Sequence, residues 1–162
     1  MTLSKEQKER AIADLSHPWG RVSLRCDGYL VTLVMQRTGK NSLTFRVTTF
    51  VNGRIEGAWF VESSAAQESR FMRKSIRPNL SAAKRKAAEK ALGKRYVARD
   101  PFYSGSYTLY LPDWVNGKAA INHLCKVCES IELLSVDEAR VALNALAKPV
   151  AAEPVVDALT EG

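Results

Sequence analysis

The sequence contains few of the groups from which catalytic sites are usually built. Only two histidines occur in its 162 residues. No nucleophile elbow, P-loop or dinucleotide-binding fingerprint is present. Asp27, Asp100 and Asp113 stand where turns or helix caps are expected, so their carboxylates have structural explanations. We therefore expect no catalytic residues and a protein that is not an enzyme.

Cysteines and long apolar runs are also scarce. Three cysteines, an odd number, do not fit a disulfide framework and are expected to be reduced thiols. No apolar run is long enough to span a bilayer. The start, from Met1 to Arg10, is polar and charged, unlike a secretory signal. The composition therefore predicts a cytoplasmic protein that does not associate with membranes.

One group of residues invites a metal interpretation. His123, Cys125 and Cys128 could bind zinc, with Cys26 or His17 completing a tetrahedral site. A strong zinc signature has two clusters of paired ligands, and this sequence has one. Cys128 also falls on the apolar stripe of an expected helix, where free cysteine is a common small core residue. We expect core packing, with no metal and no other cofactor.

Acidic residues are almost absent from residues 70–99, where Glu89 is the only one among eleven lysines and arginines. This stretch has a net charge of +10, whereas the whole chain has +7, so the remainder is mildly acidic. Concentrated positive charge attracts phosphate backbones or acidic protein surfaces. The cations that we expect to bind nucleic acid are Arg70, Arg73, Lys74, Arg77, Lys84, Arg85, Lys86, Lys90, Lys94 and Arg95.

The N-terminal half predicts a helix followed by an antiparallel sheet. Ser4 and Gln7 form a capping box for a helix over residues 4–15. Residues 21–61 then change to the period of two that is typical of strands. Turn signals divide this segment into four strands, near 21–26, 29–37, 42–50 and 54–61. Because the connections are short, neighbouring strands are antiparallel and form a four-stranded β-meander.

The last predicted hairpin allows two registers. A two-residue loop at Asn52-Gly53 would place Trp59 on the polar face of the sheet. A three-residue loop over 51–53 would instead pair Phe45 with Trp59. Because a slip of one residue moves every side chain to the other face, the apolar pattern favours the three-residue loop, with Gly53 left-handed.

The C-terminal half predicts mainly helices, packed on one face of the sheet. Residues 62–77 have a helical pattern, and Ser81 caps a second helix over 82–92 that ends at Gly93. Its first turns carry lysine and arginine, which oppose the helix dipole and favour an anionic ligand at that end. The basic segment is expected to lie across the sheet as two helices interrupted at Pro78-Asn79.

The remaining C-terminal elements follow from caps and apolar stripes. A short strand is expected near 107–111, followed by a helix from Asp113 or Asn116 to about Cys128. A Ser135–Glu138 capping box opens a last helix to about residue 147. Its inward residues are expected to be Val136, Ala139, Leu143 and Leu146. We predict a single α+β domain over residues 1–147 and a disordered tail over 148–162.

Aromatic residues gather in residues 96–114, directly after the basic stretch. Aromatic rings can stack on unpaired bases, with about 1–3 kcal/mol per base. For any one ring, core packing is the commoner role. We expect at most two of Phe102, Tyr103 and Tyr107 to be exposed.

Two resemblances extend this interpretation. The helix Ser81 to Leu92 is similar to the final helix of double-stranded-RNA-binding domains, whose N-terminal lysines contact phosphates. Lys86 matches the last of those lysines, whereas alanines stand at the places of the two before it. That resemblance implies phosphate contacts at this helix.

The second resemblance covers most of residues 4–134. The runs Phe50 to Trp59, Arg70 to Arg73, Ser81 to Lys84 and Cys128 to Glu132 resemble small basic proteins encoded by bacteriophages and prophages. The resemblance implies an accessory role in the host cytoplasm, on complexes of transcription, replication or defence. It carries no mechanism.

The sequence therefore predicts a non-enzymatic accessory protein that binds nucleic acid or a nucleoprotein complex, largely without sequence preference. The alternative is a protein that inhibits or modulates a host complex by docking the same basic surface on an acidic host protein. The sequence does not predict the oligomeric state.

Overall fold

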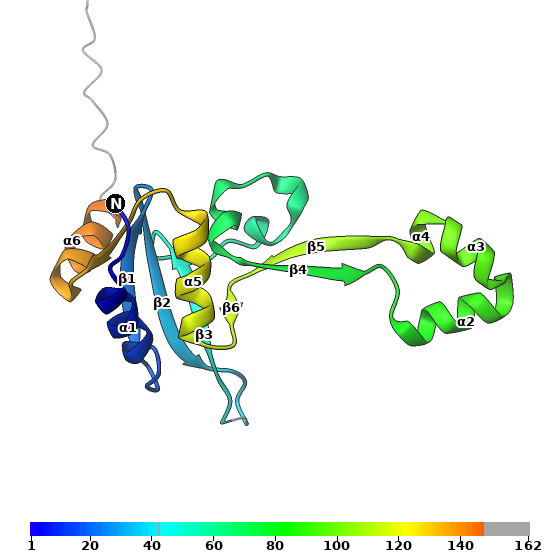
Figure 1. Cartoon of the computed structure of the whole chain (residues 1–162), viewed down its shortest axis with the longest axis horizontal. Coiled ribbons are helices and arrows are strands. Elements are labelled where there is room, and N and C mark those ends of the chain that lie inside the picture. Colours follow the sequence, from blue (N-terminus) through cyan, green and yellow to red (C-terminus); the bar gives the residue numbers. More distant parts are fainter. Residues whose placement is uncertain (42, 148–162) are drawn as a thin grey trace, which may run out of the picture.

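The computed structural model describes residues 1–41 and 43–147, and the predicted disordered tail (148–162) lies outside the described residues. Figure 1 shows a body built around an antiparallel sheet, and a long arm that projects from it. The chain forms α-helices together with antiparallel strands. The α+β class predicted from the sequence is therefore confirmed.

The sheet of the body has five strands in the order β6-β3-β2-β1-β7. β1 (Arg21–Cys26) and β2 (Tyr29–Arg37) have the predicted bounds, and β3 (Phe45–Val51) pairs with β2. The two edge strands, β6 (Asp113–Trp114) and β7 (Ile131–Leu134), come from the C-terminal half of the chain. The sheet is thus larger than the predicted four-stranded meander and is completed by distant segments.

One face of the sheet carries the core. α1 (Lys5–Asp14) begins at the predicted Ser4 capping box, and α5 (Gly117–Val127) begins at Asn116. Leu15, which follows α1, and Ile121 and Leu124 of α5 are among the buried core residues. Gly117 permits the close approach of the two helices, because a Cβ atom there would lie 2.6 Å from the Leu15 Cβ.

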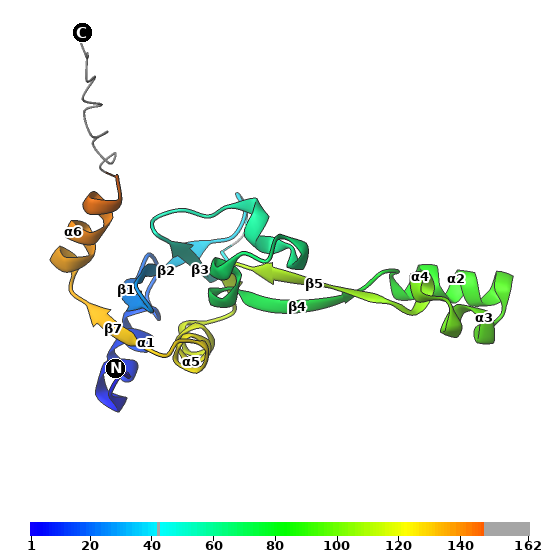
Figure 2. The same ribbon diagram turned by 90° about the horizontal axis from the view of Figure 1, so that it is seen from above.

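The last helix, α6 (Val136–Ala147), lies toward the opposite face of the sheet (Figure 2). The Ser135–Glu138 capping box is present, as predicted. No residue of α6 is buried, and Val136 and Leu146 are 86% and 51% exposed. The prediction that both point inward is therefore wrong, because α6 packs on β1, β2 and β7 from one side and no other described element covers these two side chains.

The predicted strand over 54–61 is wrong, and so is the three-residue loop before it. Val51 and Arg54 exchange two backbone hydrogen bonds of 3.0 and 3.1 Å around a two-residue Asn52-Gly53 turn. Both turn residues have positive φ, 51° and 78°. The Asn52 side chain also accepts a hydrogen bond from the Leu30 N–H at 3.0 Å. The side chain of Asn52 thus fixes the shorter turn, which the apolar pattern alone does not reveal.

After Arg54 the chain leaves the sheet in three short 3-10 helices, η1 (Gly57–Phe60), η2 (Glu62–Ser64) and η3 (Gln67–Phe71). Trp59 is buried in the core instead of pairing with Phe45. The place beside β3 expected for a fourth strand is taken by β6.

The arm begins where a helix over 62–77 was predicted. β4 (Arg73–Pro78) pairs with β5 (Ser106–Leu111) in an antiparallel ribbon. At its far end lie α2 (Ala82–Leu92), α3 (Lys94–Arg99) and α4 (Pro101–Ser104) (Figure 1). The helix prediction fails because the partner strand is distant in sequence. The basic segment therefore extends away from the sheet, and the prediction that it lies across the sheet is wrong.

Candidate nucleic-acid interface

The end of the arm, residues 79–105, is called the tip and is closed by local hydrogen bonds. Ser81 accepts a hydrogen bond from the Lys84 N–H and opens α2, which ends at Gly93 with φ +89°, as the sequence predicts. The Asn79 N–H donates to the Gly105 carbonyl at 3.0 Å and joins the two ends of the tip. Asp100 caps α4 by accepting from the Phe102 N–H at 2.9 Å. The tip is thus a defined helical unit.

The tip carries most of the predicted binding residues in exposed positions. No residue of α2 is buried, and its first turn contains no acid. Glu89 forms an ion pair of 3.5 Å with Arg85. The predicted cations on the tip, all exposed, are Lys84, Arg85, Lys86, Lys90, Lys94 and Arg95. Arg99, at the end of α3, is a further exposed cation, which the predicted set omitted.

Lys74 and Arg77 lie on β4, between the body and the tip, and both are exposed. Neighbouring positions of a strand point to opposite faces, so these two residues, three apart, lie on different faces of the ribbon. They extend the positive charge of the tip along the arm.

Arg70 and Arg73 lie at the base of the arm and bind acids of the body. Arg70 forms an ion pair of 3.2 Å with Asp27, and its guanidinium lies 4.7 Å from the centre of the Phe71 ring. Arg73 forms an ion pair of 3.2 Å with Asp113. These two arginines have a structural role. The sequence did not reveal it, because each acidic partner is about forty residues away in the chain.

Asp113 joins the arm to the sheet. Its carboxylate binds Arg46 of β3 at 2.9 Å and Arg73 of β4 at 3.2 Å. Replacing Asp113 with Ala removes the carboxylate that both partly buried guanidinium groups contact, while the backbone carbonyl of residue 113 still accepts from the Arg73 Nε–H. We expect the free energy of unfolding to fall by about 1–3 kcal/mol, measured by urea denaturation.

Asp137→Ala is the matched control for this change. Asp137 pairs only with Arg140 among the contacts described, and both side chains are exposed. An exposed pair of this kind contributes about 0–1 kcal/mol. Equal losses in the two variants would contradict the role assigned to Asp113.

Aromatic rings stand beside the cations of the tip. Tyr96 and Phe102 are 54% and 63% exposed, and both contact the half-buried Tyr103. Tyr107, at the start of β5, is also exposed. Two of Phe102, Tyr103 and Tyr107 are thus exposed, which confirms the prediction of at most two.

The cysteines lie in the body, away from the arm. Cys26 and Cys128 are buried, and all three cysteines are free thiols. A hydrogen bond to Cys128, together with burial, raises the pKa of the Cys26 thiol. The same hydrogen bond lowers the pKa of Cys128. The two thiols thus interact inside the core.

His123 is engaged in packing at the base of the arm. Its Nε2 lies 2.8 Å from the carbonyl oxygen of Arg70, which accepts the hydrogen bond, and its ring contacts Trp114. Across residues 1–41 and 43–147, no group of three or more histidine, cysteine or acidic side chains has the arrangement of a metal site.

A cavity of about 820 Å³ is lined by residues of α1, β1, β2, β7 and α6. Its charged lining balances both signs, with Glu6, Asp14 and Glu138 beside Arg10, Arg21 and Arg140. It therefore lacks the excess of positive charge found on the arm.

Comparison of the chain with protein-family models, curated proteins and solved structures found no match. In the part of the chain that the structure describes, no helix is long and apolar enough to cross a membrane. On the arm, exposed cations and exposed aromatic rings occur together.

Proposed function

We propose that the protein binds nucleic acid through the tip of its arm, largely independently of base sequence, and acts as a non-enzymatic accessory protein. The observation that carries the proposal is the exposure of seven lysines and arginines on one projecting unit with only two acids. Lysines and arginines bind the phosphate backbone, which is common to all sequences.

The arrangement of charge over the molecule supports this proposal. Residues 73–111 contain ten basic and two acidic residues, whereas the whole chain has a net charge of +7. The rest of the chain is thus close to neutral, and the positive potential is concentrated on the arm. A charge concentrated in this way steers polyanions toward one end of the molecule.

The start of α2 gives a second line of support. Lys84 lies in the first turn of the helix, and Arg85 and Lys86 follow it. Cations at this end cost about 0.3–1 kcal/mol each, because they oppose the helix dipole. A bound phosphate would be attracted both by these side chains and by the free N–H groups of the helix.

The resemblances of the sequence fit the same proposal. The resemblance of α2 to the phosphate-contacting helix of double-stranded-RNA-binding domains suggests the contact. The resemblance to bacteriophage proteins suggests the setting, in which nucleic acid or a nucleoprotein complex of the host would be bound.

A salt titration tests the proposal. Binding of a labelled oligonucleotide, measured by fluorescence anisotropy between about 50 and 200 mM salt, is expected to weaken steeply, with a log–log slope of about −0.7 to −0.9 per phosphate neutralised. Lys86→Glu is expected to weaken binding and to make the slope shallower.

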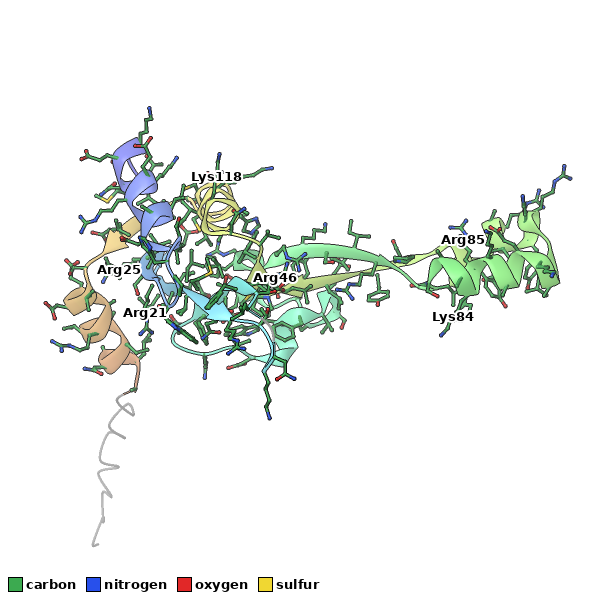
Figure 3. The ribbon with its side chains drawn as sticks, turned by 90° about the horizontal axis from the view of Figure 1, so that it is seen from below. Arg21, Arg25, Arg46, Lys84, Arg85 and Lys118 are labelled. Carbon is green, nitrogen blue, oxygen red and sulfur yellow. The ribbon has the colours of Figure 1, made fainter. Side chains whose placement is uncertain are left out.

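Lys118→Glu is the matched control, since Lys118 is exposed on α5 in the body, away from the tip (Figure 3). Both variants change the net charge equally. Equal weakening by the two variants, a flat salt dependence, or no binding at low salt would overturn the proposal.

A second candidate function is docking on an acidic host protein, and thereby inhibiting or modulating its complex. The observation that favours it is the exposure of Ile76 on β4 and Leu92 on α2 beside the cations. Apolar contacts of this kind contribute to protein interfaces. Capture from a nuclease-treated bacterial lysate of a partner that is lost with Lys86→Glu would favour this candidate.

A further inference from the structure

We infer that the tip of the arm binds single-stranded nucleic acid in preference to duplex, with Tyr96 and Phe102 stacking on unpaired bases. This inference rests on the proposed function and names its ligand class. It is carried by the geometry of the aromatic rings and by the directions of the surrounding cations.

The two rings are held in place but left open. Tyr103 lies between them, with ring centroids 5.1 Å from Phe102 and 6.2 Å from Tyr96. The Phe102 and Tyr103 rings are nearly perpendicular, at 86°. Phe102 and Tyr96 are still 63% and 54% exposed. Each therefore has ring surface available to a ligand.

Packing of the tip does not account for these rings. The structure describes all of residues 79–105, and among their apolar side chains Val97 alone is fully buried. Phe102 contacts Tyr103 but leaves most of its surface in water. Exposed aromatic surface is unfavourable in water unless a ligand covers it, at about 25 cal/mol per Å². Bases supply flat apolar surface of the matching kind.

Cations of the tip lie on more than one side of α2, because Lys84 and Arg85 extend to opposite sides of this helix (Figure 3). Lys94 and Arg95 open α3 directly before Tyr96, and Arg99 ends it. Phosphates can therefore approach the tip from more than one side.

A single strand fits this arrangement better than a duplex. Duplex DNA is stiff, with a persistence length of about 50 nm, and keeps its bases stacked inside. A single strand bends freely around a small unit and exposes its bases to aromatic rings. Because the tip offers both scattered cations and open rings, a flexible strand can use both at once.

The test compares three labelled probes of about 20 nucleotides, longer than the ~4–16 nucleotides that such sites cover. They are oligothymidylate, oligouridylate and a DNA duplex of mixed sequence. We expect the single strands to bind more tightly than the duplex at equal salt. Comparing oligothymidylate with oligouridylate shows whether the tip prefers single-stranded DNA or single-stranded RNA.

Phe102→Leu and Tyr96→Leu remove a ring and keep the charge. Each is expected to raise the Kd for the single strands about fivefold or more, because stacking contributes about 1 kcal/mol or more per base. The salt slope should stay unchanged, and duplex binding should change little. Phe102→Tyr should retain binding, since its ring can still stack. Trp19→Leu is the control, because Trp19 is 66% exposed on the body.

Each outcome decides the inference. Equal binding of duplex and single strands, or Leu variants that bind like the original protein, would overturn it and leave the proposed function standing. Equal weakening for duplex and single strands would mean that the rings only maintain the tip, which also overturns it. If none of the probes binds at low salt, both this inference and the proposed function fail.

Discussion

Replacing residues 79–105 with a two-residue Asn-Gly turn is expected to abolish nucleic-acid binding while the body remains folded. Seven lysines and arginines are removed, and the arm keeps the exposed Lys74 and Arg77 together with Arg73, which is paired with Asp113. A protein that makes six to ten phosphate contacts loses about 10³–10⁵ in affinity between 50 and 200 mM salt, so these contacts dominate its binding. With the cations of the tip removed, we expect no saturable binding of the oligonucleotide and a nearly flat dependence of the residual signal on salt.

The structure supports the feasibility of this replacement. Pro78 and Ser106 are paired residues at the end of the ribbon, so a short turn can connect them. Among the described residues, none of the core cluster of the body is removed, and Val97, buried within the tip itself, is the one buried apolar residue that is lost. A shorter connection also lowers the entropy cost of closing the loop.

Anisotropy measures the loss of binding, and thermal denaturation followed by circular dichroism measures the folding of the body. The melting temperature is expected not to fall, because the core contacts are retained. Binding within tenfold of the original protein would show that the tip is not the interface. Loss of the cooperative transition would show that the tip is needed for the body to fold.

The second large effect concerns Phe71, at the base of the arm. Its side chain is fully buried, packs on Tyr29 with ring centroids 5.3 Å apart, and lies under the guanidinium of Arg70. Phe71→Ala is expected to lower the free energy of unfolding by about 3–5 kcal/mol, because it removes a buried ring and leaves a cavity. Urea denaturation measures the change.

Phe102→Ala makes the same chemical change at an exposed position. It is expected to alter stability by only about 0.5 kcal/mol, as exposed substitutions usually do, and to weaken binding of single strands. Folded Phe71→Ala protein should bind normally, because the tip is unaffected. The prediction fails if both substitutions destabilise equally, or if Phe71→Ala protein that is folded loses binding.

The parts of the fold that the sequence predicts are those with local signals. Ser4, Ser81 and Ser135 each precede a helix, and their caps are present in the structure. β1 and β2 are joined by a short turn at Asp27-Gly28 and have the predicted bounds. Caps and short turns involve residues within four positions of each other, which a sequence pattern displays directly.

The parts that the sequence does not predict depend on distant partners. β4 is a strand because it pairs with β5, which begins at Ser106. β6 and β7 join the sheet from the C-terminal part of the chain. A segment such as 62–77 has no local feature that identifies its partner. The order of apolar and charged residues in this segment is therefore compatible with a helix as well as with a strand.

The candidate site divides in the same way. The excess of cations and the limit of two exposed rings among Phe102, Tyr103 and Tyr107 are predicted from the sequence, whereas which two rings are exposed is known only from the structure. The sequence does not predict which cations are exposed on the tip and which are paired with acids at the base of the arm. Arg70 and Arg73 differ from Lys84 only through Asp27 and Asp113, whose positions become known with the fold.

Asp113 has a mechanical consequence as well as a stabilising one. Its two ion pairs connect β4, at the base of the ribbon, to β3 of the sheet and so restrict the motion of the arm relative to the body. A nucleic-acid strand bound at the tip would then stay at a fixed distance and in a fixed direction from the body. A second protein could contact the body without displacing that nucleic acid, so the arm would separate the two binding surfaces as well as carry one of them.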